Sequence, residues 1–413
     1  MYDTVIVGAG AAGLMTAVTA AERGRSVLLL EKMDQAGRKL RITGKGRCNL
    51  TNTASLRDTL PHIGPDPRWL RNAYGRFFNH ELMDFFESRG VPLSEERGGR
   101  VFPASGKALD IFLALINELE GNPRVTIRKN ATVKSIEVFN DTVRQATAVI
   151  LQNGERIACR HIVLATGGLS YPTTGSTGAG FRIARELGHT VIDPVPALVA
   201  LRCQEKIPEE LIGFQLKNVQ LTILSSDGRL SSHFGEMTFT DDGLAGPIVL
   251  SASRTASRPL HEGQELTASL DLKPALTPEQ LDRRLQTDLA ANGTRVFNDA
   301  LRLWLPAELI PLALKQLHIE YYKRLHQITG EERRRLGRWL KNVTFTLSGT
   351  HDFNEAIITQ GGVSVDEVNP KTMESKIIQG LYIVGELLNL DADTGGHNLQ
   401  IAFSTAHAAG QAV

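Results

Sequence analysis

The chain of 413 residues is long enough for two or three domains, because a domain commonly has about 100 to 200 residues. Hydrophobic residues make up 42% of the chain and charged residues 22%, a balance that excludes a disordered or fibrous protein. The formal net charge of +1 neither requires nor excludes a polyanionic partner, so local charge has to decide that question.

The three cysteines lie far apart, with no C-x-x-C pair. This spacing argues against a disulfide framework or a zinc site and fits a reducing compartment, so we expect a cytoplasmic protein. The histidines lack metal-ligand spacing, and we expect no metal. Glu22, Arg23 and Arg25 interrupt the N-terminal apolar segment well short of the roughly 18 residues that a membrane span needs, so no membrane partner is expected.

The first thirty residues predict a βαβ unit. Residues 2–7 are a β-branched run typical of a strand, residues 14–23 form an alanine-rich helix, and residues 26–30 form a second apolar strand. The two strands should be parallel and buried.

A glycine fingerprint, Gly8-Ala9-Gly10-Ala11-Ala12-Gly13, lies between the first strand and the helix. In a dinucleotide-binding turn, Gly8 permits the tight turn, Gly10 lets the backbone approach a pyrophosphate, and Gly13 allows helix and strand to pack closely. The helix N-terminus would face the phosphate charge, and Glu31 after the second strand would accept from ribose hydroxyls. A plain turn is the simpler interpretation of the glycines, and the fingerprint alone does not choose between NAD and FAD.

The next segments suggest a second half of the same domain. Residues 37–52 are basic and glycine-rich without periodicity, which indicates a long functional loop. Amphipathic helices are expected at 80–89 and 107–120, and a further helix at 179–187. Strands are expected at 125–127, 132–138, 147–152 and 162–165. The last of these strands is closed by Thr166, Gly167 and Gly168.

A change in pattern near Asp193 marks an inserted domain. We expect a β-rich part at 191–275, with strands at 221–224 and 266–270, and a helical part at 276–345. A strand at 380–384 and an alanine-rich helix at 398–412 return to the first domain. The predicted dinucleotide-binding domain is therefore discontinuous and comprises residues 1–190 and 346–413.

Three stretches resemble the BaiN-like NAD(P)/FAD-dependent oxidoreductases. They are GRKLRITGKGRCNLTN at 37–52, IVLATGGLSYPTTGSTGAGF at 162–181, and GGVSVDEVNPKTMESKIIQGLYIVGELLNLDADTGGHNLQIAFSTA at 361–406. The resemblance implies an α/β fold with a Rossmann-like, glutathione-reductase-type FAD-binding domain. It also implies an insert that holds a small β-barrel and a helical piece, and FAD bound in an extended form with its ring at the domain junction.

The same resemblance implies a set of cofactor contacts. Glu386 would hydrogen-bond a ribityl hydroxyl, and the last helix, opened by Gly396 and His397, would stabilise negative charge on the reduced flavin. His397 and Asn389 stand where the family often has Tyr and Asp. The substrates of better-known members are therefore a less safe guide to the substrate of this chain. The expected cofactor-binding residues are Gly8, Gly10, Ala11, Ala12, Gly13, Glu31, Lys32, Gly37, Arg38, Lys39, Gly46, Arg47, Cys48, Val133, Ala165, Thr166, Gly167, Gly168, Gly385, Glu386, Gly396, His397, Asn398, Leu399 and Gln400.

Five cations fall within ten residues of the basic loop: Arg38, Lys39, Arg41, Lys45 and Arg47. Such a cluster is usually a solvated face. In a loop that resembles a cofactor loop, contacts with the FAD pyrophosphate or with an anionic substrate are the favoured interpretation.

Cys48 lies in the same loop and has two interpretations. It is either a small buried apolar residue or the catalytic proton donor for reduction of a carbon–carbon double bond, since a thiol near its ordinary pKa is protonated at neutral pH. No second G-x-G-x-x-G follows a strand, so NADH or NADPH would dock only transiently as the electron donor.

The leading hypothesis is an FAD-dependent, NAD(P)H-driven reductase of an activated carbon–carbon double bond, in an enone or a uracil-like ring, with dihydrouridine formation in rRNA included. One alternative is an FAD-dependent amine oxidase that produces peroxide. The other is an RNA-binding flavoprotein, because the helical part mixes cations with aromatic residues, although such a stretch is more often a solvated face. The partner is thus an unknown small molecule or ribosomal RNA, and the substrate and the oligomeric state stay open. The stretch contains Lys315, Tyr321, Tyr322, Lys323, Arg324, Arg333, Arg334, Arg335, Arg338, Trp339 and Lys341.

Overall fold

The computed structural model describes all 413 residues and divides them into two compact units. One unit comprises residues 1–196 and 353–413, and the other comprises residues 197–352. The divisions fall after Pro196 and Asp352, a few residues later than the domain boundaries expected from the sequence. Strand pairing explains both differences, because β11 (Val191–Ala197) pairs with β18 (Ile358–Val363) and β17 (Val343–Thr350) belongs to the barrel of the second unit.

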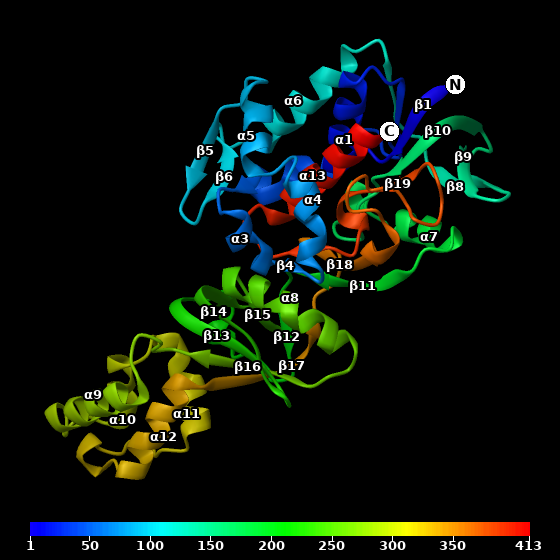
Figure 1. Cartoon of the computed structure of the whole chain (residues 1–413). Helices are drawn as coiled ribbons and strands as arrows, with labels where there is room; N and C mark the ends of the chain where they lie inside the picture. The colour runs from blue at the N-terminus through cyan, green and yellow to red at the C-terminus, as the bar shows by residue number, and fades with distance from the viewer. The chain divides into compact units, whose positions relative to one another are not determined.

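A parallel sheet forms the centre of the first unit (Figure 1). Its order is β7 (Val125–Arg128), β2 (Val27–Leu30), β1 (Tyr2–Val7), β10 (Arg156–Leu164) and β19 (Leu381–Ile383). The strands of the predicted βαβ unit are therefore neighbours, as expected. β19 comes from the far end of the chain and pairs with β10, so both ends of the sequence contribute to one sheet.

Antiparallel strands extend this sheet and flank it. The first residues of β10 pair with β9 (Arg144–Leu151), and β9 pairs with β8 (Val133–Asn140). The smaller groups are β3 (Thr51–Asn52) with β5 (Leu93–Glu96) and β6 (Arg100–Pro103), and β4 (Ile63–Gly64) with β20 (Asp391–Ala392).

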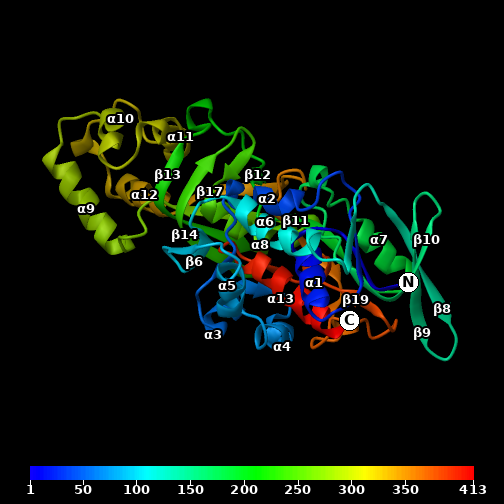
Figure 2. The ribbon, with the colours of Figure 1, turned by 90° about the horizontal axis from the view of Figure 1, so that it is seen from above.

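The first and last helices of the chain lie side by side in Figures 1 and 2. α1 (Ala11–Glu22) follows the glycine fingerprint, and α13 (His397–Ala412) is the predicted closing helix. The Thr16 hydroxyl donates to the Ala406 carbonyl at 3.2 Å. A Cβ on Gly410 would approach Thr19 Cβ to 2.6 Å, so glycine is what lets the two helices come this close.

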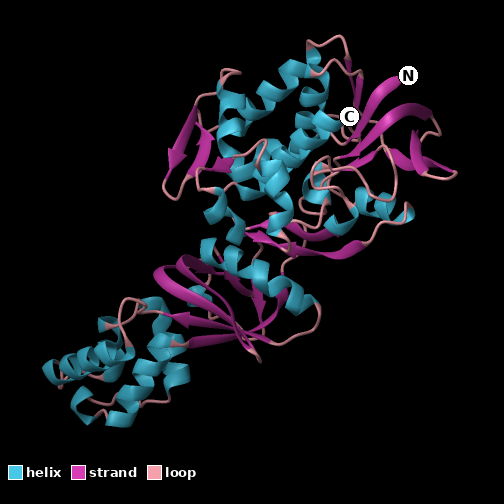
Figure 3. Cartoon of the chain, viewed as in Figure 1, coloured by secondary structure: helices cyan, strands magenta, loops and turns pink.

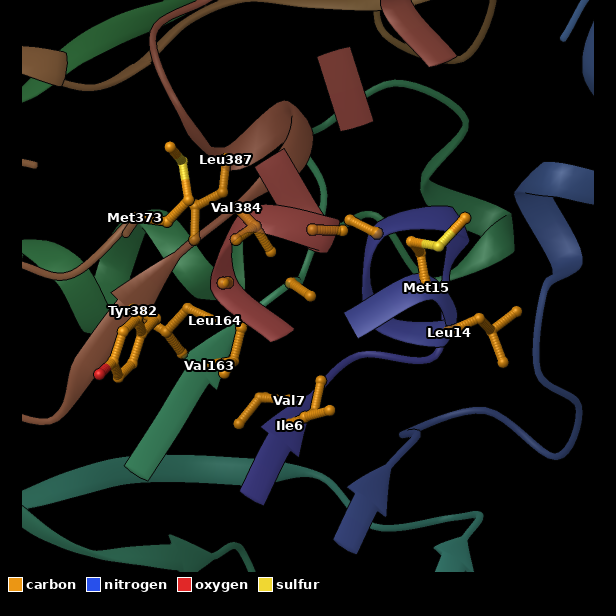
Figure 4. Close-up of a cluster of buried hydrophobic side chains, with 14 of the residues drawn as sticks. Ile6, Val7, Leu14, Met15, Val163, Leu164, Met373, Tyr382, Val384 and Leu387 are labelled. Carbon is orange, nitrogen blue, oxygen red and sulfur yellow. The ribbon is translucent and has the colours of Figure 1, made fainter. Parts of the chain in front are cut away.

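The core of the first unit joins these helices to the parallel strands (Figure 4). Ile6 and Val163 on the strands, Leu14 on α1, and Leu387 from the C-terminal segment are all fully buried. The buried ends of β1 and β10, residues 5–7 and 162–164, are apolar because both faces of a parallel sheet are covered. The other helices of this unit are α2 (Arg38–Ile42), α3 (Leu56–Thr59), α4 (Arg71–Tyr74), α5 (Asn79–Glu87), α6 (Ala108–Glu120) and α7 (Ala179–Glu186).

The second unit is a closed six-stranded barrel with attached helices (Figure 3). The strands in order around the barrel are β12 (Leu201–Cys203), β15 (Gly243–Ala245), β14 (Gly228–Phe239), β13 (Gln215–Ser225), β16 (Leu266–Asp271) and β17. The helices inserted between β16 and β17 are α9 (Pro278–Ala291), α10 (Phe297–Ala300), α11 (Ile310–Leu317) and α12 (Gly330–Lys341). The fold class expected from the sequence is thus confirmed.

Three local expectations differ from the structure. The loop at 37–52 contains the short helix α2, because Leu40 and its neighbours pack against α6. The β-rich part of the insert contains α8 (Pro247–His261), whose Ile248, Val249 and Ala252 are buried against barrel strands. Finally, the predicted helical part ends within β17, where Val343, Phe345 and Leu347 alternate inward.

No helix is both long enough and apolar enough to cross a membrane.

Candidate functional site

The ends of four parallel strands meet at one edge of the first unit's sheet. Val7 at the end of β1 pairs with Leu30 of β2 and Leu164 of β10, and Leu164 pairs with Ile383 of β19. The residues that follow these strand ends include Gly8, Glu31, Ala165–Gly168 and Gly385–Glu386. Ligands of open α/β sheets bind at the carboxyl ends of the strands, so the register brings four predicted segments to the expected place.

The glycine fingerprint is packed too tightly for side chains at two positions. Gly8 has φ +104°, and a Cβ there would lie 2.5 Å from the Ala165 carbonyl oxygen. A Cβ on Gly13 would lie 1.8 Å from the Gly8 carbonyl oxygen. By contrast, a Cβ on Gly10 would have nothing within 4 Å. The turn therefore presses α1 against β1 and leaves open space at Gly10.

The N-terminus of α1 faces this open position without a capping side chain and without an acid in its first turn. Unpaired N–H groups and the positive end of the helix dipole favour an anion there. Ala11 and Ala12 add no charge and little bulk. The residues present thus fit the pyrophosphate of a dinucleotide cofactor.

Glu31 lies beside the fingerprint and is already held in place. Its carboxylate accepts from the N–H of Ala9 at 2.9 Å and from the N–H of Met33 at 2.8 Å. Each oxygen keeps a further lone pair, as a ribose contact requires. The Glu31 carbonyl accepts from Ala131 N–H at 2.8 Å, which brings the buried Val133 and the start of β8 to the same edge.

Lys32 is directed to a neighbouring loop. Its Nζ donates to the Thr177 hydroxyl at 2.6 Å, and partial burial lowers its pKa.

Lys39 and Glu386 form the centre of a polar network at this edge. Lys39 Nζ lies 2.8 Å from one Glu386 carboxylate oxygen and also donates to the Ser170 hydroxyl. The other oxygen accepts from Ser170 Oγ and from Thr359 N–H, each at 3.0 Å. Gly168 is tightly enclosed, since a Cβ on it would lie 2.3 Å from the Thr359 hydroxyl. Glu386 is therefore oriented by three groups, Lys39, Ser170 and Thr359, before any ribityl hydroxyl is considered.

The other cations of the basic loop have different partners. Arg38 lies 3.5 Å from Asp34, and Arg41 lies over the ring of Phe112. Arg47 pairs with Glu96 and lies 4.3 Å from the centre of the Phe102 ring, which turns Gly46 and Arg47 toward the β5–β6 hairpin. Lys45 is exposed. Of the five cations, Lys39 is the one placed among the strand-end residues.

The loop at 37–52 connects the fingerprint to α13. Gly37 N–H donates to the Ala9 carbonyl at 2.8 Å, and Asn52 Nδ2 donates to the Gly395 carbonyl at 3.2 Å. A Cβ on Gly396 would lie 2.4 Å from the Thr51 carbonyl oxygen. The two ends of the chain are thus joined through this loop as well as through the sheet.

The residues that open α13 have distinct surroundings. The Asn398 side chain accepts from Ala392 N–H at 2.9 Å and donates to the Ala392 carbonyl at 2.8 Å, so it braces β20. Gln400 is 1% exposed and accepts from the Thr51 hydroxyl. His397 is buried and Leu399 is half-buried. The uncapped first turn of α13, with Gly396 at φ +99° before it, can face an anionic group through its backbone.

Cys48 is fully buried within the core of the first unit. Burial raises the pKa of its thiol to about 12, although a hydrogen bond with the Thr43 side chain opposes the rise. The thiol therefore stays protonated at neutral pH.

Thr359 and Ser170 belong to the site but were not expected from the sequence. Ser170 lies in the stretch 162–181 that carries the family resemblance but was not singled out there, and Thr359 lies outside the three stretches. The fold alone brings Thr359 beside residues about 190 positions earlier in the chain. The structure contains no group of three or more His, Cys, Asp or Glu side chains that could hold a metal ion.

Comparison with known families gives a match over nearly the whole chain. Residues 2–412 match the family model described as the HI0933-like protein Rossmann domain.

Two relatives are similar over almost their full length. The 3-dehydro-bile acid delta(4,6)-reductase of Clostridium scindens is 32% identical over 409 residues, which is 98% of each chain. The ribosomal RNA dihydrouridine synthase of Escherichia coli is 30% identical over 412 residues, covering 99% of this chain and 97% of the relative.

Among solved structures, 3-ketosteroid delta1-dehydrogenase from Sterolibacterium denitrificans shares the fold. The TM-score is 0.52 at 13% identity, with 99% of this chain and 98% of that chain covered. The sheet edge formed by glycine-containing segments, the extent of the family match and the full-length relatives all support the same assignment. The chain belongs to the HI0933-like Rossmann family of FAD-dependent oxidoreductases.

Proposed function

We propose that this protein is a reductase that uses FAD to saturate a carbon–carbon double bond conjugated to a carbonyl group. The observation that carries the proposal is the in-register meeting of the fingerprint, Ala165–Gly168 and Gly385–Glu386 at one sheet edge. This edge offers a glycine cradle, a helix N-terminus and an oriented carboxylate, which together suit a flavin nucleotide.

The relatives narrow the reaction. The name of one describes reduction of a steroid-like acid at delta(4,6) positions, and the name of the other describes formation of dihydrouridine. A 4,6-unsaturated ketone and the uracil ring share one feature, a double bond polarised by a carbonyl group. A reductase of activated double bonds is therefore the reaction class that both names support.

Each part of the site has a physical role in holding the cofactor. The first turn of α1 and the open position at Gly10 would bind the pyrophosphate, and Glu31 would bind the ribose. Glu386, oriented by Lys39, Ser170 and Thr359, would accept from a ribityl hydroxyl. The uncapped N-terminus of α13 would stabilise negative charge on the pyrimidine end. When bound, the reduced flavin supplies the hydride.

A nicotinamide donor would bind only transiently. The fingerprint at 8–13 is the one G-x-G-x-x-G that follows a strand in this chain, and the flavin would occupy it. We propose that NADH or NADPH docks at the flavin, transfers hydride and leaves before the substrate enters.

The substrate is most simply a small enone. In the helical part of the second unit, Lys323 pairs with Glu332, Arg333 with Asp282, and Lys341 with Asp271. These internal pairs remove three cations that could have contacted RNA phosphates. The exposed Tyr321 and Tyr322 favour the RNA alternative, because exposed rings can stack on bases.

All three cysteines are free. Free thiols fit a reducing compartment, and we propose that the protein acts in the cytoplasm.

The decisive experiment follows the absorbance of the purified protein under anaerobic conditions. We expect a bound-flavin spectrum that is bleached by NADH or NADPH and restored by 2-cyclohexen-1-one or by a steroid 4,6-dien-3-one. Bleaching by a small amine, with peroxide released when oxygen is admitted, would instead support an amine oxidase. A colourless protein that cannot be reconstituted with FAD would contradict the proposal.

A further inference from the structure

His62 and Asp393 form a carboxylate–imidazole pair in the first unit. His62 Nδ1 lies 2.9 Å from Asp393 Oδ2. His62 lies outside the three stretches that carry the family resemblance and Asp393 lies within the last of them, and 331 positions separate the two residues in the chain. The short ladder of β4 with β20 brings them together, because Ile63 pairs with Ala392 and Gly64 pairs with Asp391.

Backbone contacts hold this pair in one geometry. Asp393 N–H donates to the His62 carbonyl at 2.9 Å, and the Asn398 amide donates to the Asp393 carbonyl at 3.2 Å. A carboxylate on Nδ1 orients the imidazole and leaves Nε2 to act on another molecule. The pair is thus preorganised rather than a chance contact of two mobile side chains.

The imidazole of His62 also stacks on His397, the first residue of α13. The ring centres are 5.1 Å apart and the planes differ by 6°. The first turn of α13 is the segment that would face the flavin in the proposed function. The ring of His62 therefore contacts the first residue of that segment. Its side chain is 49% exposed, which leaves it accessible to a substrate and to solvent protons.

We propose that His62 is the proton donor of the reductase, that it contacts the substrate, and that Asp393 and His397 are positioning residues. The inference rests on the proposed function. It also gives a role that Cys48 is poorly suited to fill, since Cys48 is fully buried and His62 is not. A histidine is the side chain most often used for proton transfer near neutral pH.

The step balances as follows. A bound reduced flavin would supply the hydride, two electrons and one hydrogen, for the new C–H bond at the β-carbon of the unsaturated carbonyl compound. The π electrons of the double bond form the new C–H bond at the α-carbon, and its proton comes from the Nε2–H bond of protonated His62. The neutral imidazole then takes a proton from solvent at its exposed edge.

The test uses the full-length holoenzyme with His62→Gln and Asp393→Asn. His80→Gln is the matched control, because His80 is an exposed histidine on α5. Three quantities are measured anaerobically for each variant: the FAD content, the rate of flavin reduction by NADH or NADPH, and the rate of reoxidation of the pre-reduced enzyme by 2-cyclohexen-1-one. A measurement that needs no turnover, the 15N resonances of the His62 ring in the oxidised protein, reports directly on the contact with Asp393.

We expect His62→Gln to slow reoxidation by about 100-fold or more while FAD content and flavin reduction stay within about twofold. Asp393→Asn should slow reoxidation by about tenfold and shift the His62 ring resonances, since the ring loses its carboxylate. His80→Gln should change none of these. Unchanged reoxidation in His62→Gln, or an equal loss of all three quantities, would overturn the assignment.

The two levels of failure are distinguishable. If the reduced wild-type enzyme transfers no electrons to 2-cyclohexen-1-one or to a steroid 4,6-dien-3-one, the reductase function itself fails and the role of His62 fails with it. If the wild type and His62→Gln are reoxidised equally fast, only the role of His62 fails. Ring resonances of His62 that are identical in the wild type and in Asp393→Asn would remove Asp393 from the mechanism.

Discussion

At the scale of single residues, the proposed cofactor site depends on backbone that side chains cannot crowd. Gly13 shows this most clearly, because its position allows α1 to contact the turn at Gly8. A methyl group there would have to displace main-chain atoms rather than a flexible side chain. Overpacking of this kind commonly costs about 1 to 3 kcal/mol.

We therefore expect Gly13→Ala to lower the FAD content of purified protein at least about tenfold and to reduce the Tm. Bound flavin measured by absorbance, and Tm measured by fluorescence, check this. Gly121→Ala is the control, because Gly121 ends α6 with φ −85° and a Cβ there would come no closer than 3.6 Å to another atom. Full flavin content in Gly13→Ala would show that the turn tolerates the shift.

Cys48 has two interpretations that one substitution separates. With the pKa of its thiol at about 12, it would release a proton reluctantly, and a general acid works best with a pKa near the working pH. We expect Cys48→Ser to keep turnover within about threefold, with normal FAD content. Cys159→Ser, at a buried cysteine in β10, controls for the loss of a buried thiol. A loss of about 100-fold confined to Cys48→Ser would restore the thiol as proton donor.

At the scale of elements, α13 supports the fold along its whole length. Its first turn lies at the candidate site, its middle contacts α1, and His407 near its end stacks on Phe77 with ring centres 4.2 Å apart. His407 Nδ1 has no hydrogen-bond partner. Burial, helped by the nearby charge of Arg76, lowers the pKa of His407 from 6.5 to about 4.

This lowered pKa predicts acid sensitivity. Between pH 6.5 and about 4 the unfolded chain binds a proton at His407 that the folded chain does not, so the free energy of unfolding falls as the pH falls through this range. We expect His407→Phe, which keeps the aromatic stack, to flatten the fall of Tm over this interval. His80→Phe, at an exposed histidine, should leave the slope unchanged. An equally steep fall in His407→Phe would assign the acid sensitivity to other groups.

At the scale of the whole molecule, the two units differ in the candidate functional residues that they contain. The first unit contains the candidate cofactor residues and the His62–Asp393 pair, and the second contains the barrel with α9–α12 inserted between two of its strands. The paired lysines and arginines of that helical part stabilise it internally. The RNA-binding alternative therefore depends on the charges of this unit, and the salt dependence of RNA binding tests it.

If the substrate is a small enone, binding of a ribosomal RNA fragment to the full-length protein should weaken by less than about tenfold between 50 and 200 mM salt. The physical reason is that the formal net charge is only +1 and three cations of the helical part are held in internal ion pairs. A filter-binding titration at several salt concentrations checks this. A fall of about a thousandfold or more would indicate six or more phosphate contacts and support the RNA alternative. In that case Arg334→Gln with Arg338→Gln, at two exposed positions of α12, should make the salt dependence shallower.

Local patterns were sufficient for much of the first unit. β1 spans the predicted residues 2–7, and the predicted helices at 80–89, 107–120 and 179–187 correspond to α5, α6 and α7. Their buried faces repeat with a regular period, so the signal is contained in neighbouring residues. α8 was missed because its surroundings are strands, and β17 because a helical stretch precedes it directly.

The order of residues alone determined the glycine turn and the parallel strands around it, because each depends on short-range pattern and composition. The membership of both chain ends in one nucleotide-binding domain was implied by the resemblance to a known family. Only the tertiary structure decided that Lys39 rather than Arg47 lies beside Glu386, that Thr359 orients that carboxylate, and that His62 lies against Asp393. The physical reason is that a side-chain pair is specified by strand register and packing between distant segments. Residues hundreds of positions apart carry no mark of each other until the chain has folded.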